Sequence, residues 1–119
     1  YVSHFAPLPE DAIRAIRSAG GVAVIAHPFA SRRGQTLSPD SFQSLVSAGL
    51  NGIEVFHRDQ SEDERNELIA SANALDLAIT GSSDYHGTGK LNQLGENTTS
   101  QAEWERLESM ADQRRVVSR

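Results

Sequence analysis

Histidine and carboxylate side chains recur at the ends of apolar segments in this 119-residue sequence. His27 follows the apolar segment in GGVAVIAHP (20–28), and Asp84 and His86 lie in GSSDYHG (81–87), just after a second such segment. Residues i and i+2 of an extended chain point to the same side, so Asp84 and His86 are presented together. Imidazole nitrogen with carboxylate oxygen suits Zn, Mn or Fe, and there is no cysteine to supply a thiolate. The pattern predicts a metal site that contains His27, Asp84 and His86.

Each of these patterns has a simpler interpretation when it is taken alone. A lone histidine at a strand end is more often a buried side chain that hydrogen-bonds a backbone carbonyl. Asp84 could cap a glycine-rich turn, with His86 on the surface. Pro28 disfavours a helical conformation of the residue before it, so we expect His27 to be extended and directed off the strand. The occurrence of all three residues after neighbouring strands favours the metal site.

Glu54 and His57 lie in a third segment of this kind, GIEVFHRD (52–59). A carboxylate inside an apolar strand needs a partner, so Glu54 could support a metal ligand or pair with an arginine. Alternatively, the strand lies at an edge of the sheet and Glu54 faces water. We expect His57 at the rim, where it could contact substrate or the surroundings of the metal. Arg58-Asp59 is interpreted as a local salt-bridged turn.

Two long loops carry cations that suit an anionic substrate. Arg32 and Arg33 lie in residues 28–37, and Lys90, the sole lysine, lies in residues 81–99. Guanidinium and ammonium groups bind phosphate or carboxylate, so these residues are candidate substrate-binding residues. The alternative for each is a solvated loop charge. Loops of this length in a compact domain are usually functional or disordered.

Helices and buried strands alternate along the chain, which predicts parallel strands in an α/β fold. The carboxyl ends of such strands meet at one rim, so the candidate residues converge there. A closed barrel needs about eight strands, and three parallel strands leave two open edges. We therefore expect a partial β/α barrel or a small open sheet that finds a partner. The predicted strands are 22–26, which we expect to be buried on both faces, 52–56 and 77–80. The predicted helices begin near Pro9, Ser38, Ser61 and Ser100. Glu64 and Glu103 are expected to complete capping boxes with Ser61 and Ser100, and Trp104 and Leu107 to form the inner stripe of the last helix.

The composition limits the classes of partner. The chain has 16 acidic residues against 11 Lys and Arg, for a net charge of −5. A broad non-specific nucleic-acid surface would need a basic face, whereas a small anionic substrate held by a few cations is compatible with this charge. No apolar segment approaches the length of a membrane helix. The absence of cysteine fits a reducing compartment, and we expect a cytoplasmic protein.

Taken together and in order, AHP (26–28), GIEVFHRD (52–59), GSSDYHGTGK (81–90) and LGEN (94–97) resemble a known family. It is the PHP family of polymerase-and-histidinol-phosphatase metal-dependent phosphoesterases, in particular the TrpH-like members that act on nucleotides. The resemblance is to the carboxyl-terminal part of the family. It implies a distorted barrel of about seven β/α units and two or three divalent ions. It also implies that His27, Asp84 and His86 are metal ligands, and it gives Glu54 and His57 no ligand role.

The family begins with an H-x-H strand, and this sequence contains no H-x-H. We therefore expect residues 1–119 to be a single incomplete PHP-like domain, with a frayed tail at 112–119. The predicted parent is a phosphoesterase acting on nucleotides or short oligonucleotides, in which His57 or His86 protonates the leaving oxygen. One alternative is a sugar- or histidinol-type phosphatase. The other is a non-catalytic α/β module that associates with itself or with the missing half.

Overall fold

Three parallel strands form the centre of the fold. The computed structural model describes residues 9–29, 41–83 and 95–111. Within them the strands β1 (Val24–Ile25), β2 (Gly52–Phe56) and β3 (Ala78–Gly81) form one sheet in the order β1-β2-β3. Gly52 of β2 lies opposite Val24 on one side and opposite Ala78 on the other. The predicted parallel α/β sheet is confirmed, and β2 is its central strand.

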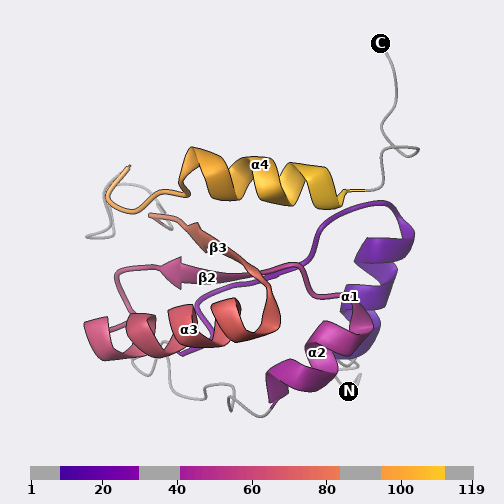
Figure 1. The fold of residues 1–119 in the computed structure, drawn as a ribbon, viewed down its shortest axis with the longest axis horizontal. Coiled ribbons are helices and arrows are strands. Elements are labelled where there is room, and N and C mark those ends of the chain that lie inside the picture. Colours follow the sequence, from indigo (N-terminus) through magenta and orange to yellow (C-terminus); the bar gives the residue numbers. More distant parts are fainter. Residues whose placement is uncertain (1–8, 30–40, 84–94, 112–119) are drawn as a thin grey trace, which may run out of the picture.

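Four helices cover this sheet on both sides (Figure 1). Helix α4 lies on one side, and α2 and α3 lie on the other, with α1 packed against α2. Both the number of helices in the described residues and the number of strands match the expectation from the sequence. The helices are α1 (Pro9–Ser18), α2 (Phe42–Ala48), α3 (Glu62–Leu75) and α4 (Gln101–Met110).

Local sequence signals account for several helix ends. The Ser61 side chain accepts the Glu64 N–H at 3.1 Å while the Glu64 side chain accepts the Ser61 N–H at 2.8 Å, so the predicted capping box of α3 is confirmed. Gly49 ends α2 with φ 114, a conformation that favours glycine. At α4 the Ser100 side chain accepts the Glu103 N–H. These contacts are local, which is why the sequence pattern predicts them.

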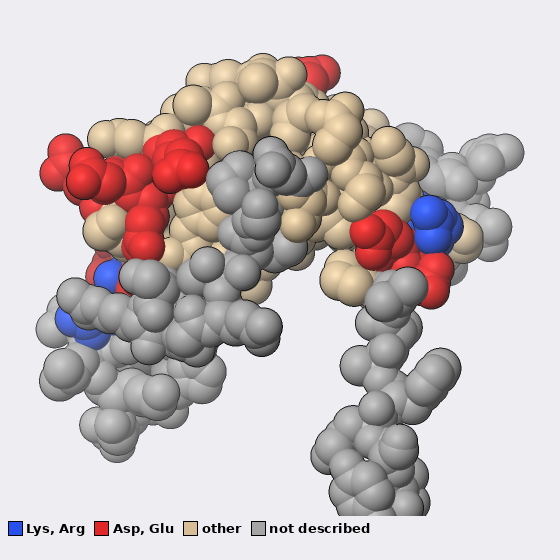
Figure 2. All heavy atoms as spheres, turned by 90° about the horizontal axis from the view of Figure 1, so that it is seen from below, with Lys and Arg blue, Asp and Glu red and all other residues tan. Residues whose placement is uncertain are grey.

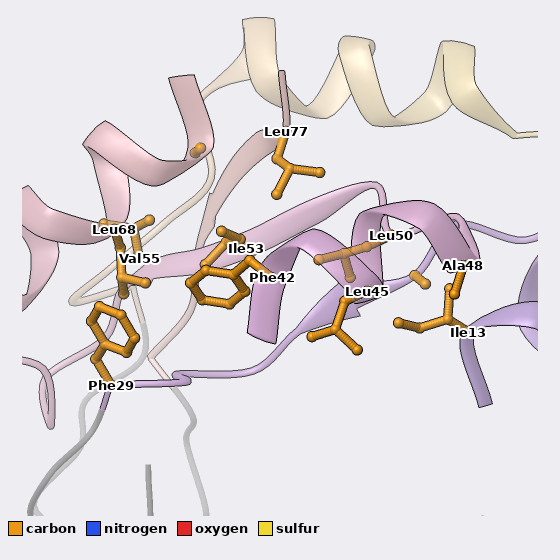
Figure 3. Close-up of a cluster of buried hydrophobic side chains, with 12 residues drawn as sticks. Ile13, Phe29, Phe42, Leu45, Ala48, Leu50, Ile53, Val55, Leu68 and Leu77 are labelled. Carbon is orange, nitrogen blue, oxygen red and sulfur yellow. The ribbon is translucent and has the colours of Figure 1, made fainter. Parts of the chain in front are cut away.

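The core lies between β2 and the helices α2 and α3 (Figure 3). Phe42, Ile53 and Leu68 have no exposed surface. The expectation that strand 22–26 is buried on both faces is wrong, because Val24 is 38% exposed. Trp104, expected on the inner stripe of α4, is 60% exposed. The described elements leave both of these side chains partly uncovered.

Side chains of α4 satisfy backbone groups at the outer edge of β3. The Ala78 N–H faces β2, where it donates to the Asn51 carbonyl. Backbone groups alternate between the two sides of a strand, so the Leu77 carbonyl and the Ile79 N–H face away from β2. Among the outward groups, the Ile79 N–H donates to the Glu103 carboxylate at 2.7 Å. Arg106 donates to the Leu77 carbonyl at 3.2 Å. The expectation of two open edges is therefore wrong at this edge, where side chains occupy the strand's hydrogen-bonding groups.

The described surface is acidic where α3 begins. Figure 2 shows a group of carboxylates at that end of the molecule, and the first turn of α3 contains Glu62, Asp63 and Glu64. Carboxylates at this end of a helix interact favourably with the helix dipole. No helix in the described residues is long and apolar enough to cross a membrane.

Truncation of Leu68 should be far more damaging than truncation of Trp104. Leu68→Ala leaves a cavity beside β2 and should lower the free energy of unfolding by about 2–5 kcal/mol. Trp104→Ala removes an exposed side chain and should change it by about 0.5 kcal/mol or less. Urea unfolding followed by circular dichroism measures both. Equal losses for the two variants would contradict the described core.

Candidate metal centre

His27 lies at a sharp change of direction just after β1. Its φ is 25°, in the left-handed region, so the expectation that Pro28 keeps it extended is wrong. A non-glycine residue in such a conformation costs about 1–3 kcal/mol and persists when its surroundings over-determine it. The His27 N–H donates to Oε1 of Glu54 at 2.9 Å. This hydrogen bond holds the half-buried His27 against β2.

Glu54 lies in the central strand, so its interpretation as an exposed edge-strand residue is wrong. Its half-buried carboxylate accepts the backbone N–H of His27 rather than pairing with an arginine in the described part of the chain. The pairing of β2 with β3 shifts register between Glu54 and Phe56. Such irregularities re-aim side chains at the end of a strand, here beside the candidate site.

His57 follows β2 and is completely buried. Its ring centroid lies 4.6 Å from that of His27, with the two planes tilted by 54°. The Asp59 N–H donates to Nδ1 of His57 at 3.0 Å. A backbone amide can only donate, so Nδ1 is an acceptor and the neutral ring carries its proton on Nε2. His57 is therefore set up as a donor at Nε2.

Together these three residues form a group suited to a divalent metal. One ligand atom from each of His27, Glu54 and His57 lies within 4.8 Å of the others. The His27 imidazole and the Glu54 carboxylate match the donor preferences of Zn, Mn or Fe, and the His57 ring lies beside them. The residues present therefore fit a metal ion, and they lie at the carboxyl end of the sheet as the parallel-strand prediction requires.

Arginines next to this group make contacts that the sequence pattern did not predict. Arg65 of α3 donates through Nη2 to the His57 carbonyl at 2.8 Å, while its buried Nε has no hydrogen-bond partner. Arg58 forms an ion pair with Glu96 at 3.6 Å, which connects the turn after β2 to the segment before α4. The interpretation of Arg58 as part of a purely local turn is therefore too narrow.

Several predicted site residues lie outside the described residues. Their placement stays a prediction, and they are Arg32, Arg33, Asp84, His86 and Lys90. Among the rest, the structure brings His27 and His57 together. It adds Glu54, to which the sequence resemblance assigned no ligand role. The available signal was a single carboxylate in an otherwise apolar strand that ends at the same rim.

Known proteins with similar sequences are phosphoesterases, although no family model matches the chain. It is 41% identical to the phosphoribosyl 1,2-cyclic phosphate 1,2-diphosphodiesterase of Eggerthella lenta over 86 residues, 71% of the chain and 31% of that protein. It is 38% identical to the 3',5'-nucleoside bisphosphate phosphatase of Chromobacterium violaceum over 90 residues, 76% of the chain and 32% of that protein. Its homologues are PHP-type metal-dependent phosphoesterases. The predicted resemblance is confirmed.

The PHP-type fold is confirmed by a solved structure. A crystal structure from Bifidobacterium adolescentis, classed as a metal-dependent phosphoesterase, superposes with a TM-score of 0.86 and 36% sequence identity. The match covers 93% of this chain and 39% of that protein. The chain thus spans about a third of the length of the curated relatives it matches.

Removal of the Glu54 charge should weaken metal binding. Glu54→Gln keeps an oxygen that can accept the His27 N–H but removes the anionic ligand, so the affinity for Mn²⁺ or Zn²⁺ should fall by at least about tenfold. Glu67→Gln on the exposed face of α3 is the matched control and should leave the affinity unchanged. Isothermal titration calorimetry on the folded chain measures both. Equal affinities for the two variants would exclude Glu54 as a ligand.

Proposed function

We propose that His27 and Glu54 hold a divalent metal ion in an enzyme that hydrolyses phosphate esters of nucleotides or short oligonucleotides. The observation that carries this proposal is the convergence of His27, Glu54 and His57, with ligand atoms within 4.8 Å of one another. Asp84 and His86 complete the proposed ligand set. Mn, Zn and Fe all suit these donors.

The proposed substrate class is supported by two relatives. One is a phosphoribosyl cyclic phosphate diesterase and the other is a nucleoside bisphosphate phosphatase, and both names describe a phosphorylated pentose. Because the chain spans about a third of their length, we propose that it is part of a longer enzyme. Turnover then requires the complete gene product, whereas the 119-residue chain alone binds one ion weakly and is inactive.

Each residue has a distinct proposed role. A divalent ion held at this site would polarise the phosphoryl group and make water a stronger acid, which would supply a nucleophile near neutral pH. His27 and Glu54 hold that ion at the rim of the sheet. His57, which carries its ring proton on Nε2, donates a hydrogen bond to the leaving oxygen and stabilises its developing charge, while water supplies the proton. Arg32, Arg33 and Lys90, which come from the two long loops, neutralise the charge of the phosphate.

Loss of a ligand should abolish activity in the complete gene product. His27→Ala and Asp84→Ala should each reduce the hydrolysis of a 3',5'-nucleoside bisphosphate to background, in the presence of Mn²⁺ or Zn²⁺. Release of inorganic phosphate measures the rate. Glu105→Gln, on the exposed side of α4, is a control that should keep full activity. Unchanged rates in both ligand variants would end the proposal, and a preference for sugar or histidinol phosphates would redirect the substrate class.

His57 as a hydrogen-bond donor gives a separate prediction. His57→Asn should lower kcat for the nucleotide substrate by about 10²- to 10³-fold, because the charge that develops on the alkoxide leaving group then loses its hydrogen bond from Nε2. A p-nitrophenyl phosphate ester has a leaving group that departs without protonation, so its hydrolysis should fall far less. Metal affinity should change little. Equal losses on the two substrates, together with weakened metal binding, would instead make His57 a metal ligand.

A second candidate function is non-catalytic association, and exposed apolar side chains on the sheet favour it. Val24 of β1 and Phe56 of β2 are each 38% exposed. Apolar side chains exposed on a sheet can mark a contact with another chain. Self-association of the chain without any metal binding would support this candidate over the enzyme.

A further inference from the structure

Side chains continue the β1–β2 pairing beyond the point where the backbone ladder ends. β1 pairs with β2 at only two positions, Val24 with Gly52 and Ile25 with Ile53. Further along, the backbone N–H groups of the chain that leaves β1 donate to side chains. The His27 N–H donates to Glu54, as described above, and the Phe29 N–H donates to Oε1 of Gln60 at 2.9 Å.

The Gln60 side chain connects both chain segments of the candidate site. Gln60 is only 2% exposed, and its Nε2 donates to the carbonyl of Glu54 at 3.1 Å and to that of Val55 at 2.7 Å. Its Oε1 accepts from Phe29, so the acceptor and the amide donors all have partners. This bridge needs a carbonyl and an amide on one side chain. A carboxylate would present no donor to the two carbonyls, and an apolar side chain would remove all three of these hydrogen bonds.

The hydrogen bonds of the Gln60 side chain act on the backbone at or near the candidate metal ligands. Gln60 holds the backbone at Glu54 on one side and the backbone two residues after His27 on the other. His27 is kept at φ 25 between its own hydrogen bond to Glu54 and the Gln60 contact at Phe29. A conformation of this kind persists only when neighbouring contacts over-determine it.

We propose that Gln60 is a positioning residue that sets the separation of His27 from Glu54 and His57, and thereby the affinity of the site for a divalent metal. This inference rests on the proposed metal-binding function. Gln60 itself supplies no ligand, because its three hydrogen bonds to the backbone occupy its amide. It acts through the two backbone segments that it joins.

The chain contains a matched control at the opposite end of the same strand pair. Asn51 is 8% exposed, and its Oδ1 accepts the Ala23 N–H at 2.8 Å. It therefore also joins the β1 segment to the β2 segment through a buried side-chain amide. Asn51 precedes β2, whereas the candidate ligands lie at or beyond its carboxyl end. Loss of either amide should destabilise the fold, but only Gln60 should affect the metal site.

The experiment compares Gln60→Met with Asn51→Leu, which replace each amide by an apolar side chain of similar size. Thermal unfolding should show a lower Tm for both variants. Titration calorimetry of the folded chain with Mn²⁺ or Zn²⁺ should show affinity weakened about 10- to 100-fold in Gln60→Met, the range expected for residues that orient ligands. In Asn51→Leu the change should stay within about twofold, as expected for a distant site. Equal weakening in both variants, or none in Gln60→Met, would overturn the inference.

A metal-free measurement separates this inference from the proposed function. The rings of His27 and His57 are close enough for a nuclear Overhauser effect between their protons. This effect should be present in the native chain and in Asn51→Leu and absent from Gln60→Met. If the native chain binds no metal, the proposed function fails, while persistence of the effect in Gln60→Met would refute the positioning role. Should Gln60→Met not fold, Gln60→Asn keeps an amide that is one methylene too short, and it should show the same loss.

Discussion

The hydrogen bond between the His27 N–H and the Glu54 carboxylate is the contact on which the candidate site depends. It joins the end of a very short strand to the central strand of the sheet, and it uses a charged acceptor, which makes it stronger than a bond between neutral groups. It also brings the two ligand-type side chains together before any ion is considered. A site assembled in advance loses less conformational freedom when it binds a metal.

The short β1–β2 ladder explains why buried polar side chains matter so much in this fold. Where a strand pair continues for many residues, backbone hydrogen bonds fix the separation of the chains. Here side-chain amides take over that task at both ends of the pair, Asn51 at the beginning and Gln60 at the carboxyl end. Buried polar groups of this kind are costly to leave unpaired, so each one restricts the backbone that it contacts.

Within the described residues, the sheet near β1 has apolar side chains that are partly exposed, in contrast with the edge at β3. The β3 edge is closed by Glu103 and Arg106, which occupy backbone groups of that strand. Val24 and Phe56 stay partly exposed on β1 and β2. The match to about a third of each curated relative supports the proposal that further chain completes the enzyme. The site lies at the end of the strands that carry these exposed side chains.

Sequence patterns predicted the features that depend on neighbours along the chain. The Ser61 capping box and the glycine at the end of α2 involve residues three or four positions apart, so their physics is present in the local sequence. Expectations failed where a group far away in the sequence competed for a hydrogen bond. Glu103 was expected to complete a capping box with Ser100, but its carboxylate accepts the outward N–H of Ile79 instead. Trp104 fits an apolar helical stripe, yet no element in the described residues covers it.

By itself, the sequence determined the alternation of helices and strands, the parallel sheet and hence the shared rim to which His27 and His57 belong. The periodicity of apolar residues and the geometry of parallel strands suffice for that. Only the tertiary structure decided which atoms face one another: the turn at His27, the role of the Glu54 carboxylate and the proton position on His57. These depend on hydrogen bonds between residues far apart in the chain or on backbone turns, and no local pattern of residue types encodes them.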